Sequence, residues 1–162
     1  MNVWLEMITG RNKKRYPAAQ VLPWAGFAVL FLLFFWRAFR GFDWSDESVA
    51  FAAPYRLLLG DTPLVDSWDS HMGWSILAAP FLAVYRQWKG SMDGILLTGR
   101  MIFLFVHMAV AGVVYRRLLQ FCRSHLAAML AGWLTAAFVP GMIFNFSYSS
   151  AGLLLMVLSC TT

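Results

Sequence analysis

The chain has 162 residues, of which 60% are hydrophobic, 17% aromatic and 13% charged, and its formal net charge is +5. Apolar runs recur with short polar breaks between them, which excludes an ordinary soluble domain and predicts several membrane helices. The basic residues gather at the ends of these runs, where they orient membrane helices, so the positive charge does not indicate a nucleic-acid partner.

The first predicted transmembrane helix covers residues 19–39. A basic run from Arg11 to Arg15 precedes it, and Arg37 and Arg40 lie at its end without a small-x-small cleavage site. We therefore expect an uncleaved anchor helix. The basic run places residues 1–18 in the cytoplasm by the positive-inside rule, so the chain after the helix is expected outside.

An acidic outer loop follows, over residues 40–94. Six of the chain's eight acidic residues lie within residues 43–69 of this loop, namely Asp43, Asp46, Glu47, Asp61, Asp66 and Asp69. We expect Ser45 to cap a short helix whose first turn contains Asp46 and Glu47, where the helix dipole favours carboxylates.

The apolar run 73–84 inside this loop is about half of the roughly 20 residues that a membrane crossing needs. If it crossed, the later residues Arg116 and Arg117 would fall outside, against the positive-inside rule. We therefore predict that 73–84 lies along the outer interface, where the rings of Trp74 and Trp88 are suited to the headgroup depth.

The remaining predicted segments follow in chain order: transmembrane helix two (95–115), a cytoplasmic loop (116–124), transmembrane helix three (125–144), an outer turn (145–151) and the start of a fourth helix (152–162). The last run is too short to cross, so we expect either a fragment of a longer protein or the product of a truncated gene. The expected fold is an all-α polytopic membrane protein with three full transmembrane helices, the start of a fourth, and short interfacial helices in a large first outer loop.

Several motifs resemble the N-terminal part of membrane glycosyltransferases of the GT-C class, which include protein O-mannosyltransferases and the transferase that adds aminoarabinose to lipid A. The motifs are Asp46-Glu47 with Ala53–Pro63, Asp66–His71 before an apolar run, Gly99-Arg100 with Tyr115–Leu118, and Asn145–Gly152. The resemblance covers about residues 42–158. Met72-Gly73 depart from it, since family members often carry prolines after the histidine.

The resemblance implies an enzyme of the plasma (inner) membrane that takes a sugar from a polyprenyl-phosphate carrier at the outer face. It implies Asp46 as the catalytic residue that deprotonates or positions the acceptor hydroxyl, with Glu47 beside it. Candidate substrate-binding residues are Asp69, His71, Arg100 and Arg56. The expected partners are the lipid-phosphate sugar donor and membrane lipids.

Each of these residues has a plainer interpretation. Asp46 and Glu47 can simply cap a helix in water, and Asp69 with His71 can belong to a solvated loop. Arg100, about one and a half turns inside helix two, can contact a lipid phosphate or extend to the headgroups. His107, in mid-helix, is expected to be packed and hydrogen-bonded.

The alternative hypothesis is a non-catalytic small membrane protein, or a degenerate fragment of such an enzyme. The sequence predicts no metal site and no definite cofactor. It leaves open the need for a divalent cation, the donor sugar, the acceptor and the oligomeric state.

Overall fold

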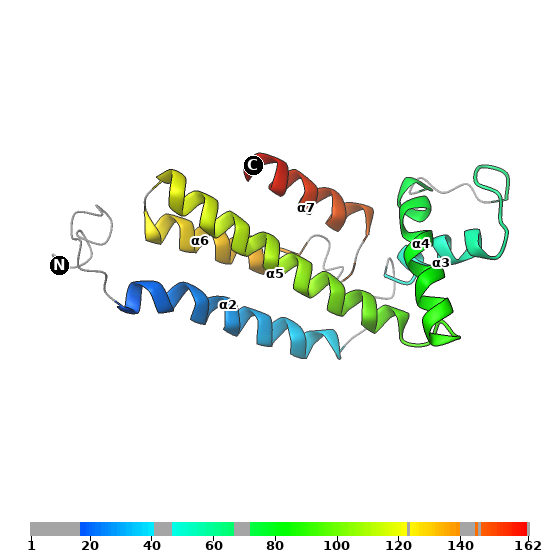
Figure 1. Ribbon diagram of the computed structural model, residues 1–162, viewed down its shortest axis with the longest axis horizontal. Coiled ribbons are helices and arrows are strands. Elements are labelled where there is room, and N and C mark those ends of the chain that lie inside the picture. The colour runs from blue at the N-terminus through cyan, green and yellow to red at the C-terminus, as the bar shows by residue number, and fades with distance from the viewer. Residues whose placement is uncertain are drawn as a thin grey trace.

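The computed structural model describes residues 17–40, 47–66, 72–122, 124–139, 145 and 147–161. Within these ranges the chain forms six helices and no β-strand (Figure 1). The helices are α2 (Pro17–Ala38), α3 (Val49–Leu58), α4 (Met72–Lys89), α5 (Ile95–Cys122), α6 (His125–Ala137) and α7 (Tyr148–Thr161). The all-helical class expected from the sequence is confirmed.

Helix α5 is the centre of a bundle. It has 28 residues, and α2, α6 and α7 all contact it, while α2 also contacts α6. Figure 1 shows these three helices running along α5, with α2 and α7 on different sides of it. Two buried clusters fill the bundle, one around Phe27, Ala111, Tyr115 and Ala128 and the other around Phe103, Leu104, Val110 and Leu154.

Two segments of the described chain are long and apolar enough to cross a membrane, Val21–Ala38 and Ile95–Cys122. Helices α6 and α7 have only 13 and 14 residues. A rise of 1.5 Å per residue makes each of them about 20 Å long, short of the roughly 30 Å of a bilayer core. The described residues thus contain two span-length helices, where the sequence predicted three and part of a fourth.

The third predicted span, 125–144, is helical over a shorter range. Ser124 caps its start by accepting a hydrogen bond from the backbone N–H of Ala127 at 3.4 Å. The helix ends at Ala137, because Phe138 has an extended backbone with ψ 110°. Residues 140–144 lie outside the described part of the chain.

The second predicted span, 95–115, is longer than expected. Helix α5 continues to Cys122 and includes most of the predicted loop 116–124. Residues 116–120 are all good helix formers, so nothing ends the helix there. They are Arg116, Arg117, Leu118, Leu119 and Gln120.

Helices α3 and α4 form a cap at the N-terminal end of α5. They pack against each other, and their shared core includes Phe51, Leu82, Tyr85 and Ile95, the first residue of α5. Figure 1 shows α4 running across the direction of α5, beyond the end of the bundle. The chain reverses between α4 and α5 at Gly90 and Gly94, both with φ of 77°, a region that glycine adopts without strain.

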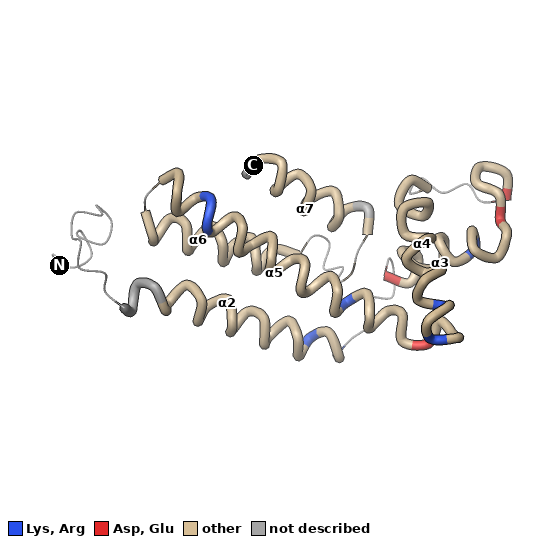
Figure 2. The backbone as a smooth tube through the Cα atoms, viewed as in Figure 1, with Lys and Arg blue, Asp and Glu red and all other residues tan. Residues whose placement is uncertain are grey.

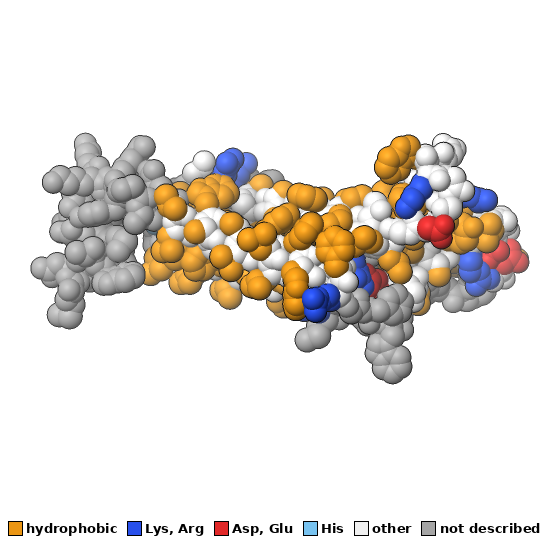
Figure 3. Space-filling model, turned by 90° about the horizontal axis from the view of Figure 1, so that it is seen from below, with side chains coloured by type: hydrophobic (Ala, Val, Ile, Leu, Met, Phe, Trp, Pro, Cys, Tyr) orange, Lys and Arg blue, Asp and Glu red, His pale blue; other side chains and the backbone are white. Residues whose placement is uncertain are grey.

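The predicted interfacial run 73–84 belongs to α4, which extends beyond it to Lys89. α4 is not among the segments with the composition of a membrane span in the described chain. Charged residues are rare along the bundle and more frequent in the cap. Figure 2 shows no charged residue along the middle of α2 or of α5, and Figure 3 shows a bundle face covered by hydrophobic side chains, with several charged residues near the cap.

Candidate functional site

A buried ion pair joins the start of the cap to the bundle. The guanidinium of Arg100 donates from Nε to Oε1 of Glu47 at 2.6 Å and from Nη2 to Oε2 at 2.5 Å. The side chain of Glu47 is 1% exposed and that of Arg100 is 11% exposed. This paired geometry is the strong form of an arginine–carboxylate contact, and burial protects it from solvent screening.

The same arginine also holds the end of the first span. Its Nη1 donates to the backbone carbonyl of Ala38 at 2.7 Å. That carbonyl lies at the C-terminal end of α2, where helix carbonyls have no partner inside the helix. Arg100 therefore binds the end of α2 and Glu47, two residues before α3, to the second turn of α5.

Asn145 completes this network from the C-terminal side. Its side-chain amide donates to Oε1 of Glu47 at 3.2 Å and to the carbonyl of Leu96 at 3.3 Å. Its own backbone carbonyl accepts from the hydroxyl of Ser150 at 2.8 Å, at the start of α7. Asn145 is fully buried, so this amide links α7 to the ion pair.

Gly99 makes room for the network. A Cβ at this position would come within 2.5 Å of Oδ1 of Asn145 and of Cζ of Phe51. Residue 99 therefore has to lack a side chain for the asparagine and the cap to approach α5 this closely. The two residues of the Gly99-Arg100 motif therefore have different roles. Gly99 leaves space for Asn145 and Phe51, and Arg100 binds Glu47 and Ala38.

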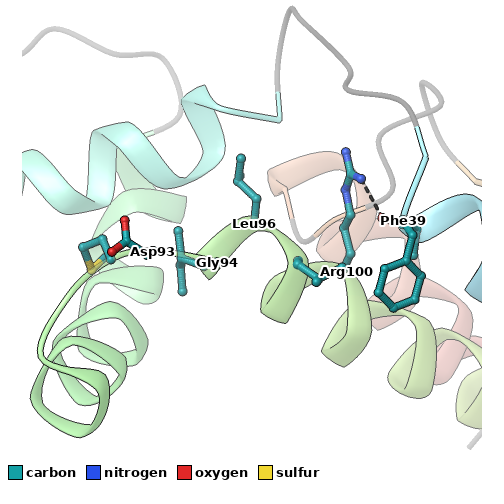
Figure 4. A pocket seen from close by; sticks show the side chains of 9 residues that line it. Phe39, Asp93, Gly94, Leu96 and Arg100 are labelled. Carbon is teal, nitrogen blue, oxygen red and sulfur yellow. Dashed lines mark hydrogen bonds between the residues drawn. The ribbon is translucent and has the colours of Figure 1, made fainter.

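An open pocket of about 490 Å³ lies beside this network. Its lining comes from the end of α2, the turn before α5 and the first turns of α5: Ala38, Phe39, Met92, Asp93, Gly94, Ile95, Leu96, Leu97 and Arg100. Figure 4 shows the side chain of Arg100 extending from α5 toward the segment that carries Phe39, with Asp93 on the far side. The pocket combines apolar walls with one acidic and one basic side chain.

The sequence predicted that Glu47 lies in the first turn of a helix. In the structure it lies before the helix instead. Helix α3 begins at Val49 after Ser48, which makes no side-chain capping bond. Glu47 precedes the helix and its carboxylate is used by Arg100 and Asn145. The buried guanidinium offers this carboxylate stronger partners than the helix start does.

The side chain of Arg100 is largely buried. Its donors are directed at Glu47 and Ala38, and it also lines the open pocket. Arg56 lies elsewhere, on α3, where Nε donates to Oδ2 of Asp61 at 2.6 Å. The structure therefore does not bring the two predicted arginines together.

Three predicted site residues, Asp46, Asp69 and His71, lie outside the described part of the chain, as does Asp43. His107 is packed and hydrogen-bonded as expected: it is buried, with Nε2 3.1 Å from the carbonyl of Ala136. Among the described residues, no group of three His, Cys, Asp or Glu side chains is placed to hold a metal ion.

Asn145 was expected in an outer turn without a role, whereas it is a buried member of this network. In the sequence, Asn145 is a polar amide between an apolar helix and an apolar run. This position could have indicated a buried hydrogen-bonding role, since buried polar groups need partners. Comparison with protein-family models, curated proteins and solved structures found no match to this chain.

Proposed function

We propose that the chain is an integral membrane protein that acts as a glycosyltransferase, or as the N-terminal part of one, with its N-terminus in the cytoplasm of a cell with a plasma (inner) membrane. The two span-length helices support the membrane location. The motifs of the acidic loop and of α5 support the reaction class by their resemblance to GT-C enzymes. The transferred group is a sugar carried on polyprenyl phosphate at the outer face.

The observation that carries this proposal is the buried Glu47–Arg100–Asn145 network. It fixes the residue directly after Asp46 between α2, α5 and the start of α7. In this proposal Glu47 is the anchored neighbour of the catalytic carboxylate, Asp46. A catalytic carboxylate needs such a rigid support if it is to meet a hydroxyl within hydrogen-bonding distance.

The two acidic residues then have different roles. Both oxygens of Glu47 accept hydrogen bonds from Arg100, so Glu47 is a positioning residue in this proposal. Asp46 is the base. The acceptor oxygen attacks the anomeric carbon, the bond from that carbon to the phosphate oxygen breaks, Asp46 takes the hydroxyl proton, and polyprenyl phosphate leaves with the bonding pair.

The apolar pocket beside Arg100 is the proposed entry for the lipid-linked donor. It opens at the end of both span-length helices, where a lipid chain in the bilayer would arrive. Arg100 contributes positive charge to its lining, while its hydrogen bonds keep it with Glu47.

The catalytic test is the substitution Asp46→Asn in the full chain. It keeps size and hydrogen bonding but removes the proton acceptor, so we expect transfer from a polyprenyl-phosphate sugar to fall about a hundred- to ten-thousand-fold. Asp43→Asn, four residues after Phe39, is the matched control and should retain transfer. The readout is sugar transfer in membranes at equal expression of all three proteins.

Near-normal transfer by Asp46→Asn would remove it from the catalytic role and make Asp69 the next candidate. Absence of transfer by the unsubstituted chain with every donor offered would favour the alternative, a non-catalytic membrane protein or a degenerate fragment.

The proposed orientation has its own test. In a chain that lacks Cys122 and Cys160, a cysteine at position 67 should react with a membrane-impermeant reagent added outside, and one at position 120 should not. The reverse pattern would place the acidic loop in the cytoplasm and exclude donor chemistry at the outer face.

A further inference from the structure

A second open pocket lies where α4 leads into α5. It has a volume of about 470 Å³ and is lined by Tyr85, Trp88, Lys89 and Thr98, none of which lines the pocket beside Arg100. Thr98 and Arg100 are two positions apart on α5, which places them on different faces of the helix. The two pockets are therefore separate, and the proposed transfer reaction does not use this one.

The ammonium group of Lys89 is held in place at the edge of this pocket. Its Nζ donates to the carbonyl of Asp93 at 2.7 Å and to the hydroxyl of Tyr85 at 3.2 Å, and it lies 5.6 Å from the centre of the Tyr85 ring. Gly94 leaves room for it, since a Cβ there would lie 3.1 Å from Nζ. A charged group that is already fixed loses little freedom when a ligand binds to it.

This ammonium has no anionic partner in the part of the chain that the structure describes. Both of its acceptors are uncharged oxygens. The carboxylate of Asp93 instead accepts from the hydroxyl of Ser91 at 3.0 Å, and Asp93 lines the other pocket. Because an ammonium group has three N–H donors, one donor and the positive charge of Lys89 are available to a ligand. We therefore expect the ligand to carry a negative charge.

The other walls of the pocket suit a ring with hydroxyl groups. Trp88 is 82% exposed, so most of its indole is available as a flat apolar surface. The hydroxyl of Thr98 donates to the carbonyl of Gly94 at 3.1 Å, and its oxygen can still accept a hydrogen bond. A sugar ring matches this combination, because it has apolar C–H faces and hydroxyl groups at its edge.

We propose that this pocket binds a sugar ring that carries a carboxylate or a phosphate group. The indole of Trp88 packs on a C–H face of the ring, the oxygen of Thr98 accepts from a ring hydroxyl, and Lys89 binds the anionic group. The proposal does not rest on glycosyl transfer, and its test measures binding instead of activity.

The test uses two probes that differ at a single carbon, methyl β-glucuronide with a carboxylate and methyl β-glucoside with a hydroxymethyl group. The full chain is placed in nanodiscs of phosphatidylcholine, a lipid without net charge, and saturation-transfer NMR measures the dissociation constant of each probe. We expect the glucuronide to bind about two- to fivefold more tightly, the range of an exposed charge pair, and we expect added salt to reduce that ratio.

Three variants locate the binding. Lys89→Gln removes the charge and should make the two dissociation constants equal. Trp88→Ala removes the apolar wall and should weaken both probes by the same factor. Arg86→Gln is the matched control, because Arg86 is also exposed in the last turn of α4 but lies over the Tyr55 ring, 5.9 Å from its centre, outside the pocket lining. It should change neither constant.

Absence of saturable binding, or equal binding of both probes by the unsubstituted chain, would overturn the proposal. A ratio that survives Lys89→Gln, or that falls as far in Arg86→Gln, would overturn it in favour of a general effect of surface charge. Unchanged binding in Trp88→Ala would overturn the role of the indole. In Lys89→Gln the hydroxyl of Tyr85 still binds the carbonyl of Asp93 at 2.6 Å, and circular dichroism checks that each variant folds. The salt dependence of the unsubstituted chain tests the charge without any variant.

Discussion

Two arginine–carboxylate pairs among the described residues have nearly the same bond length and very different surroundings. Arg100 meets Glu47 at 2.5 Å with side-chain exposures of 11% and 1%, whereas Arg56 meets Asp61 at 2.6 Å with exposures of 55% and 27%. The first pair joins residues 53 apart in the sequence and the second joins residues five apart. Bond length alone therefore does not distinguish a buried pair that joins distant segments from an exposed pair between neighbouring residues.

The surroundings decide what each pair is worth. At the surface, water solvates both charges when the pair opens, so little free energy is at stake. In the interior, an opened pair leaves a charge without solvent, and the loss of one partner is far more damaging than the loss of both. The comparison therefore predicts a graded series of substitution effects.

The largest effect is expected at the buried pair. Arg100→Ala removes the cation that binds the Glu47 carboxylate in the interior, and should lower the free energy of unfolding by about 3–5 kcal/mol. The measurement is unfolding of the purified chain by a denaturing detergent in mixed micelles, followed by circular dichroism.

The matched control is the double variant Glu47→Gln/Arg100→Met, which removes both charges while keeping long side chains. It should be less destabilised than Arg100→Ala, because no unpaired charge remains. A loss below about 1 kcal/mol in the single variant, the range of exposed pairs, would mean that water reaches this pair and that it resembles the Arg56–Asp61 pair.

The second effect tests the close approach that brings the buried pair together. Gly99→Ala adds a methyl group within 2.5 Å of Asn145 and Phe51, so we expect it to destabilise the fold by about 1–3 kcal/mol through overpacking. Gly112→Ala on the same helix is the control, since a Cβ there meets nothing within 4 Å. Alanine is the better helix former by about 1 kcal/mol, so this control should be neutral or stabilising. Equal behaviour of the two variants would show that the network tolerates a wider separation.

The two regions also differ in how far their sequence predicts them. The long apolar runs around Val21–Ala38 and within Ile95–Cys122 follow from composition, because the length of an apolar run is a local property. The Glu47–Arg100 pair and its contact with Asn145 join residues 53 and 98 positions apart, and no periodicity encodes which distant partner a buried arginine selects. A charged residue inside an apolar helix is costly to bury, so the sequence identified Arg100 as a residue that needs a partner. Its pairing with Glu47 is a property of the packing.

Helix ends were predicted less well for a related reason. The second predicted span was ended at 115 because two arginines follow, yet α5 continues to Cys122, since charge alone does not end a helix. The third was extended to 144, past the extended residue Phe138. Membrane composition and helix length are separate properties, and only the first of them can be read directly from hydropathy.

The smallest effect is expected at the exposed pair. Arg56→Ala removes the contact with Asp61 and a long bond of 3.4 Å to the carbonyl of Asp66, and should lower the free energy of unfolding by no more than about 1 kcal/mol. Added salt should reduce even that difference, because solvent ions screen exposed charges.

The same variant tests whether Arg56 forms only a local ion pair or also binds the sugar donor, the role that the sequence suggested for it. A purely local pair leaves the KM for the lipid-linked donor unchanged, whereas a donor contact raises KM while stability stays as it was. A loss of several kcal/mol, as at Arg100, would remove the contrast between the two pairs.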